Sequence, residues 1–127
     1  MTSDAALFAL AAEAHASGRA LMFDVRADWC VPCRELETNT FAEPGIVSML
    51  DREFVLARLD VTDPKPAAEA LQMRVGGGAM PWVLLWPMTS QEAKAFAGGE
   101  VPPPAKTVST FVSARELLPI LTAVAES

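Results

Sequence analysis

The sequence predicts an α/β domain in which a mixed four-stranded sheet is flanked by helices on both faces. Two observations indicate this fold class. Short apolar runs of strand length alternate with helical patterns through the first half of the chain, which is typical of parallel strands joined by right-handed crossovers. The last two apolar runs are joined by a segment with little helical pattern, which suits an antiparallel pair. The chain has 127 residues, enough for one hydrophobic core, so we expect residues 1–127 to form a single domain.

Helices are predicted where the pattern is helical and a capping residue marks the start. Ser3 or Thr2 can cap the first helix, and Gly18 follows its end. The second helix begins just after Cys30, and its pattern breaks at an adjoining Pro-Gly pair. Ser113 can cap the last helix. The predicted helices cover residues 4–16, 31–41, 46–50, 67–73, 91–96 and 114–125.

Strands are predicted at short apolar runs, of which the first is nearly continuous and indicates a strand buried on both faces. Three consecutive glycines at 76–78 break the chain before the third strand. Residues 87–105 contain a Gly-Gly pair and three consecutive prolines, so part of this stretch must be loop. The predicted strands cover residues 20–25, 54–61, 82–86 and 106–111.

Charge and hydropathy exclude several classes of function. The formal net charge is −6, which disfavours nucleic acid as a partner because phosphate binding needs clustered Lys and Arg. No apolar run approaches the roughly 18 to 20 residues that cross a bilayer, so we expect no membrane contact by this chain, and we expect a monomer. The first residues lack a basic segment before their apolar stretch and resemble an amphipathic helix more than a signal peptide. The chain is therefore cytoplasmic, or part of an exported protein whose targeting element is absent.

The most informative motif is Trp-Cys-Val-Pro-Cys at residues 29–33, which contains both cysteines of the chain. The spacing lets the sulfurs of Cys30 and Cys33 meet across one helical turn, and Cys30 lies at the positive end of a predicted helix, where a thiolate is favoured. Thiol–disulfide exchange needs an exposed attacking thiolate and a second thiol that resolves the mixed disulfide. We expect Cys30 to attack and the more buried Cys33 to resolve, with Pro32 stiffening the loop between them.

Two other interpretations of the pair are weaker. A zinc site needs four ligands, and only His15 remains as a plausible soft partner. A purely structural disulfide across so short a loop would add little stability. The Trp and Pro beside the cysteines favour a redox function.

Residues 27–37, Ala-Asp-Trp-Cys-Val-Pro-Cys-Arg-Glu-Leu-Glu, are followed by Thr40-Phe41 and resemble the thioredoxin superfamily. More narrowly, they are similar to the C-terminal thioredoxin-like domain of the DsbD family. This resemblance implies a thioredoxin fold, a dithiol/disulfide cycle, protein partners on both the upstream and the substrate side, and no bound cofactor or metal. If the chain is DsbD-like, the resemblance also implies a periplasmic location. The dipeptide Val31-Pro32 combines the valine of the DsbD domain with the proline of thioredoxins.

Two carboxylates near the motif are candidate catalytic residues. Asp24 lies in an apolar strand and matches the buried acid of the thioredoxin family, which implies proton exchange with Cys33; the alternative is a solvent-facing Asp at a strand edge. Glu37 follows Cys33 by four residues and so shares its helical face. It matches an acidic residue of the DsbD-type motif, which implies that it raises the thiol pKa values. The alternative is a solvated helix residue.

The candidate substrate-binding residues are Trp29, Val31, Pro32, Met80 and Pro81. The Met80-Pro81 pair precedes the third predicted strand, where the thioredoxin fold has a cis-proline facing the cysteines. That position implies a cis bond despite the general preference for trans.

These residues predict a protein-disulfide reductase. The proline in the dipeptide and the absence of the histidine typical of strong oxidants favour the reductive direction. A non-catalytic interaction module or redox sensor with the same fold is the main alternative, and a dithiol metallochaperone is a third.

Overall fold

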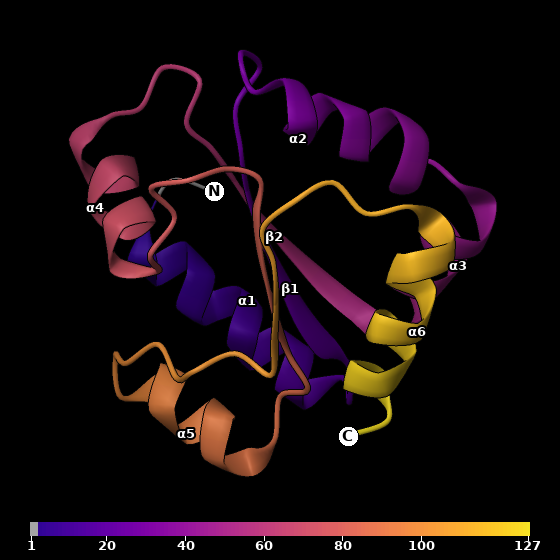
Figure 1. Cartoon of the computed structure of the whole chain (residues 1–127). Coiled ribbons are helices and arrows are strands. Elements are labelled where there is room, and N and C mark those ends of the chain that lie inside the picture. Colours follow the sequence, from indigo (N-terminus) through magenta and orange to yellow (C-terminus); the bar gives the residue numbers. More distant parts are fainter. Residues whose placement is uncertain (1–2) are drawn as a thin grey trace.

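A computed structural model describes residues 3–127, whose centre is one mixed sheet (Figure 1). The strands are β1 (Ala20–Arg26), β2 (Phe54–Asp60), β3 (Trp82–Trp86) and β4 (Lys106–Val108). Their order across the sheet is β2-β1-β3-β4. β1 and β2 are parallel, whereas β3 runs antiparallel to both β1 and β4. The predicted mixed four-stranded sheet is confirmed.

Helices cover both faces of this sheet, as predicted. They are α1 (Asp4–Ala16), α2 (Val31–Glu35), the π-helical turn η1 (Leu36–Thr40), α3 (Pro44–Glu53), α4 (Pro66–Arg74), α5 (Ser90–Ala97) and α6 (Ala114–Ala125). One apolar cluster joins α1, α4 and α5 to the first face, and a second joins α3 and α6 to the other. In Figure 1 these two layers lie left and right of the sheet, and α2 lies across the top. No helix within residues 3–127 has the length and apolar character needed to cross a bilayer.

Strand β1 is the centre of the core because its two faces both pack against helices. Leu21 and Phe23 point into the cluster with α1, α4 and α5, whereas Met22 points into the cluster with α3 and α6. Side chains of a strand alternate between faces, so the strand needs apolar residues at consecutive positions. The continuous apolar run in the sequence follows from this double burial.

The predicted caps are present at both ends of the chain. The Ser3 hydroxyl accepts a hydrogen bond from the Ala6 N–H at 3.3 Å and begins α1. Thr2, the other candidate, lies outside the described residues. Ser113 and Glu116 form a reciprocal capping box at the start of α6.

The segment after the cysteines differs from the prediction. The predicted break near Pro44 is present at residues 41–43, which separate η1 from α3. Pro44 itself occupies the first turn of α3, where its missing N–H has no helical partner. The Glu43 side chain caps this helix by accepting from the Ile46 N–H at 3.1 Å, so α3 is longer than the predicted 46–50. The predicted helix over 31–41 is α-helical only to Glu35 and continues as the π-helical turn η1.

The region of β4 also differs from the prediction. The strand predicted over 106–111 ends at Val108, which pairs with Val83 near the start of β3. Beyond it, the Thr40 hydroxyl donates to the Val112 carbonyl and ties the chain to η1 instead of the sheet. The connection before β4 contains the two-turn helix α5, so it is not nearly helixless, yet β3 and β4 still form the predicted antiparallel pair.

Candidate redox site

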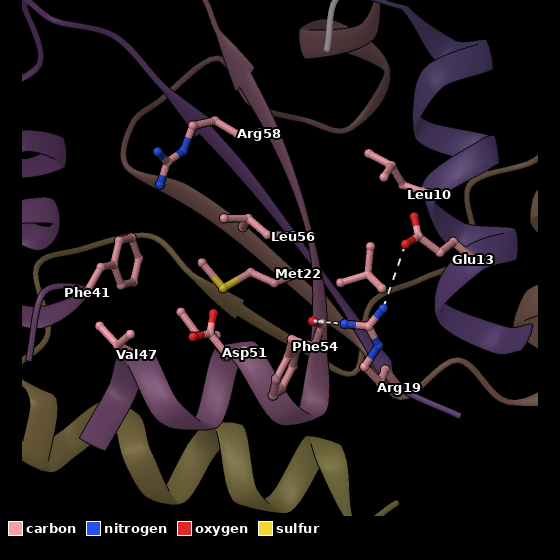
Figure 2. A pocket seen from close by; sticks show the side chains of 12 residues that line it. Leu10, Glu13, Arg19, Met22, Phe41, Val47, Asp51, Phe54, Leu56 and Arg58 are labelled. Atoms are coloured by element: carbon pink, nitrogen blue, oxygen red, sulfur yellow. Dashed lines mark hydrogen bonds and ion pairs between the residues drawn. The ribbon is translucent and has the colours of Figure 1, made fainter. Parts of the chain in front are cut away.

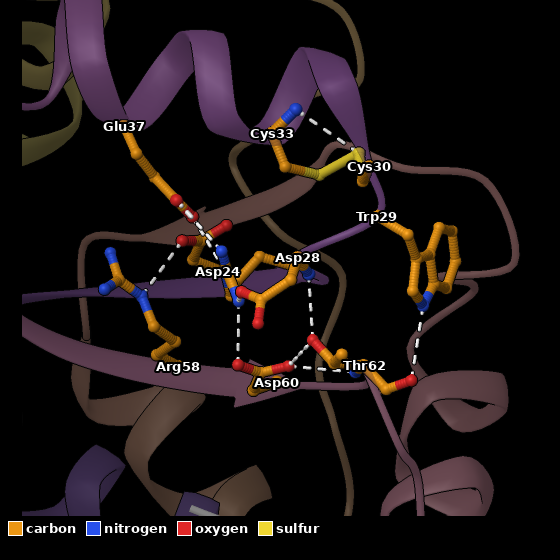
Figure 3. A network of polar contacts seen from close by, with 10 residues as sticks. Asp24, Asp28, Trp29, Cys30, Cys33, Glu37, Arg58, Asp60 and Thr62 are labelled. Carbon is orange, nitrogen blue, oxygen red and sulfur yellow. Dashed lines mark hydrogen bonds and ion pairs between the residues drawn. A yellow bond between two sulfur atoms is a disulfide. The ribbon is translucent and has the colours of Figure 1, made fainter.

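The two cysteines lie where the chain leaves β1 and enters α2. Cys30 occupies the N-cap position of α2, and its Sγ accepts a hydrogen bond from the Cys33 N–H at 3.3 Å. A disulfide joins the two residues, whose Cα atoms are 5.3 Å apart (Figure 3). The structure therefore represents the oxidised state of the pair.

Burial of the cysteines corrects one expectation. Cys30 is 6% exposed and Cys33 is 3% exposed, so the expected exposed position of Cys30 is wrong for this oxidised form. The disulfide holds both sulfurs against the cluster of α1, α4 and α5. The open surface belongs instead to the neighbours Trp29 and Val31, which are 63% and 61% exposed. Pro32 is also exposed.

The Met80–Pro81 peptide bond is cis, as expected. Trp82, the next residue, pairs with Val25 near the end of β1, so the register brings the cis-proline to the same sheet end as the cysteine loop. Met80 packs against the apolar cluster that contains both cysteines. A Cβ atom at Gly77 would lie 3.2 Å from the Trp82 ring and 3.3 Å from the Gln72 carbonyl oxygen, so any other residue there would make tight contacts with both.

Asp24 is buried, with 2% of its surface exposed, which excludes the solvent-facing alternative. In register it lies between Arg58 of β2 and Val83 of β3. The Arg58 Nε donates to Asp24 Oδ2 at 3.3 Å. Burial raises the pKa of Asp24 to about 6, because desolvation outweighs the opposing charge of Arg58, and the charge of Glu37 raises it further. The carboxyl group can therefore gain and lose a proton near neutral pH.

Glu37 is not a solvated helix residue. Arg26 Nε donates to Glu37 Oε2 at 2.8 Å, and Arg26 Nη2 donates to Oε1 at 3.0 Å. In Figure 3 the carboxylates of Glu37 and Asp24 converge beneath the helix that carries Cys33. The sequence analysis named both acids as candidates but missed Arg26. An arginine at the end of a buried strand, close in sequence to Asp28 and Glu37, could have suggested an ion pair at this place.

Arg26 also belongs to a polar network that fixes the loop before Cys30. Its Nη1 donates to Asp28 Oδ1 at 2.6 Å and to Asp60 Oδ2 at 2.7 Å. The Thr62 hydroxyl accepts from the Asp28 N–H at 2.8 Å and donates to Asp60 at 2.6 Å. The Trp29 ring N–H donates to the Thr62 carbonyl at 3.2 Å (Figure 3). These contacts tie the exposed tryptophan and the cysteine loop to the end of β2.

Metal binding receives no support from the arrangement of ligands. Within residues 3–127, no three or more His, Cys, Asp or Glu side chains cluster in a way that could hold an ion. His15, the possible zinc partner, has its Nδ1 3.1 Å from the Met88 carbonyl oxygen.

A groove of about 480 Å³ lies along the outer side of β2 and the adjoining surface of α3 (Figure 2). Apolar side chains including Met22, Val47 and Leu56 line it, and neither cysteine does. Arg58 links the two places, because it lines the groove and also contacts Asp24.

Residues 3–87 match the family model described as thioredoxin-like. The chain belongs to the thioredoxin-like family. Its relatives include the thiol:disulfide interchange protein DsbD of Klebsiella pneumoniae, which is 37% identical over 79 residues, covering 62% of this chain and 13% of the relative. DsbD of Vibrio cholerae is 37% identical over 75 residues, covering 59% of this chain and 12% of the relative. The chain thus spans about one-eighth of the length of these relatives.

Solved structures agree with this family. The oxidised C-terminal domain of Neisseria meningitidis DsbD is 25% identical, with a TM-score of 0.71 and 97% coverage of both chains. A thioredoxin from Thermus thermophilus is 21% identical, with a TM-score of 0.71, and covers 97% of this chain and 84% of its own. The thioredoxin fold is confirmed. Together, the family, the fold and the Cys30–Cys33 pair make this a thiol–disulfide oxidoreductase domain.

Proposed function

We propose that this chain is a protein-disulfide reductase domain that passes two electrons from an upstream dithiol to a disulfide in a protein substrate. The Cys30–Cys33 disulfide at the start of α2 is the observation that carries this proposal. The similarity to DsbD supports it, as does the exposed surface of Trp29 and Val31 beside the cysteines.

The reaction begins with the reduced pair. The Cys30 thiolate, favoured by its N-cap position, attacks one sulfur of the substrate disulfide, and the other substrate sulfur leaves as a thiolate that takes up a proton. The Cys33 thiolate then attacks Cys30 Sγ and releases the second substrate thiol. The substrate gains two electrons, and the chain ends in the disulfide form until an upstream dithiol reduces it again.

Asp24 has the role of proton acceptor in the second step. Cys33 must lose its proton to attack, and a carboxyl group with a pKa of about 6 is ionised at neutral pH yet basic enough to take that proton, directly or through water. Glu37 acts beside it as a second negative charge that raises the thiol pKa values.

Substrate proteins dock on the surface around the cysteines. Trp29, Val31 and Pro32 provide its exposed side chains, and the Met80-Pro81 pair provides backbone groups for an extended segment of the substrate. The Val31-Pro32 dipeptide favours the reductive direction. The similarity to DsbD supports a periplasmic location, with protein dithiols upstream and protein disulfides downstream, and we propose that the chain works as a monomeric single domain.

Insulin reduction by dithiothreitol tests this function. The wild-type chain should accelerate the reduction, and Cys30→Ser should abolish the acceleration. Cys33→Ser should instead accumulate mixed disulfides on Cys30, which mass spectrometry detects. Equal rates for wild type and Cys30→Ser would favour a non-catalytic interaction module, and an adduct trapped only on Cys33 in Cys30→Ser would reverse the two roles.

A further inference from the structure

Arg26 is the most heavily engaged charged side chain of the redox site. Only 11% of its side chain is exposed, and it makes four hydrogen bonds to three carboxylates. Those acids come from three separate segments: Glu37 from η1, Asp28 from the cysteine loop and Asp60 from the end of β2. A planar guanidinium satisfies such a set because its donors form a rigid fork, which a lysine cannot reproduce.

This cluster lies next to Asp24. Arg26 follows Asp24 by two residues on β1, so both side chains leave the same face of the strand. The charged groups that act on Asp24 come from three elements: Arg58 of β2 and Arg26 of β1 lower its pKa, and Glu37 of η1 raises it. The Arg26 clamp holds both oxygens of Glu37, so it determines where that negative charge lies relative to Asp24.

We propose that Arg26 is a positioning residue of the redox site, which fixes the Glu37 carboxylate beside Asp24 and offsets part of its negative charge, and so sets the pH range over which Asp24 exchanges a proton with Cys33. This role rests on the proposed function and adds a residue that acts through Glu37 and Asp24, without contact to the sulfurs.

The proposal predicts opposite shifts in two variants. Arg26→Met removes a cation and the partial compensation of Glu37, so the titration midpoint of Asp24 should rise, and by less than in Arg58→Met, since Arg58 lowers the pKa of Asp24 more than Arg26 does. Glu37→Gln removes the negative charge, so the midpoint should fall below that of the wild type. The double variant should return toward the wild-type value. Carbon-13 NMR of the Asp24 carboxyl group in the oxidised protein measures all three midpoints, and the acidic limb of the pH profile of insulin reduction should move with them.

Arg52→Met is the matched control: among residues 3–127, Arg52 hydrogen-bonds only to Ser48, one turn earlier in α3, so its loss should leave the midpoint unchanged. Arg26→Lys keeps the charge without the fork and should give a smaller rise than Arg26→Met. An Asp24 midpoint that does not move in Arg26→Met would overturn the proposal. If that variant does not fold, Arg26→Lys decides: a raised midpoint supports the proposal, and an unchanged one overturns it.

The role of Arg26 and the reductase function can be overturned independently of each other. The carboxyl titration needs no turnover, so it tests Arg26 even if insulin reduction fails. An inactive wild-type chain would overturn the reductase function, whereas an active one with an unmoved Asp24 midpoint would overturn only the role of Arg26.

Discussion

Two aspartates on neighbouring strands each pair with an arginine, yet the pKa of one is raised and the pKa of the other is lowered. Asp24 of β1 pairs with Arg58 at 3.3 Å, and the pKa of Asp24 is raised to about 6. Asp60 of β2 pairs with Arg26 at 2.7 Å, and hydrogen bonds from Thr62 and then Arg26 lower the pKa of Asp60. The side chain of Asp24 is 3% exposed, whereas that of Asp60 is 51% exposed.

Burial, and not the presence of an arginine, decides the difference. Desolvation disfavours the ionised form of Asp24 by more than Arg58 favours it. Asp60 keeps most of its hydration, so its hydrogen bonds dominate. The same residue type therefore supplies a proton acceptor at one position and, at the other, an anchor for the cysteine loop that is ionised at neutral pH.

The largest effect is expected from Asp24→Asn. The unfolded chain ionises Asp24 near pH 3.8, but the native state keeps the proton to about pH 6, so native stability falls as the pH rises through this range. Asparagine is neutral at every pH, so the Asp24→Asn protein does not lose this stability as the pH rises. The free energy of unfolding should rise by about 1 to 3 kcal/mol at pH 7 and by no more than about 0.5 kcal/mol at pH 4, as measured by denaturant titration.

The same variant should slow thiol exchange by about 10²-fold at pH 7, because the proton acceptor for Cys33 is lost. Asp63→Asn is the matched control, since it removes the same charge from an exposed loop position and should change neither property. If Asp24→Asn is fully active and has the wild-type free energy of unfolding at both pH values, burial of Asp24 affects neither stability nor thiol exchange.

Arg58→Met should have a smaller effect of opposite sign on stability. Without Arg58 the pKa of Asp24 rises further, so the ionised carboxylate costs more at pH 7. Because Arg58 is 44% exposed, solvent screening limits the loss to about 1 kcal/mol. The loss should vanish at pH 4, where Asp24 is protonated in the native state. A loss of equal size at both pH values would attribute the effect to packing of the arginine stem.

The smallest effect is expected from Asp60→Asn. A carboxylate with a lowered pKa stabilises the native state above its unfolded pKa, and this contribution disappears as the pH falls through the folded pKa. The variant should lose less than about 1 kcal/mol at pH 7, because the group is half-exposed, and nothing in strong acid. The acidic limb of the activity profile should stay in place. Movement of that limb would show that Asp60, and not burial of Asp24, controls the proton.

Sequence alone predicted the parts of the site that depend on local pattern. The Cys30–Cys33 spacing, the burial of Asp24 among apolar neighbours and the cis bond before Pro81 all follow from short segments or from family resemblance. The parallel pairing of the first two strands follows from the alternation of strands and helices, and the last two strands were predicted as an antiparallel pair; the order of the strands across the sheet was not predicted.

Features that depend on distant segments could not be predicted. The Arg26 clamp needs Glu37 of η1 and Asp60 of β2, which only the fold brings together. The chain after the early end of β4 at Val108 makes a contact that joins distant segments, the hydrogen bond from Thr40 to Val112 across the domain. Cys30 is buried as a member of an apolar cluster whose residues come from distant parts of the chain. In each case tertiary contacts override a local pattern.

A carboxyl titration of the oxidised wild-type protein tests the central claim most directly. Carbon-13 NMR should give Asp24 a midpoint near pH 6 and Asp60 a midpoint below the ordinary value of 3.8. Midpoints for both residues at or below that ordinary value would contradict the account, because Asp24 would then be too weak a base to take the proton of Cys33.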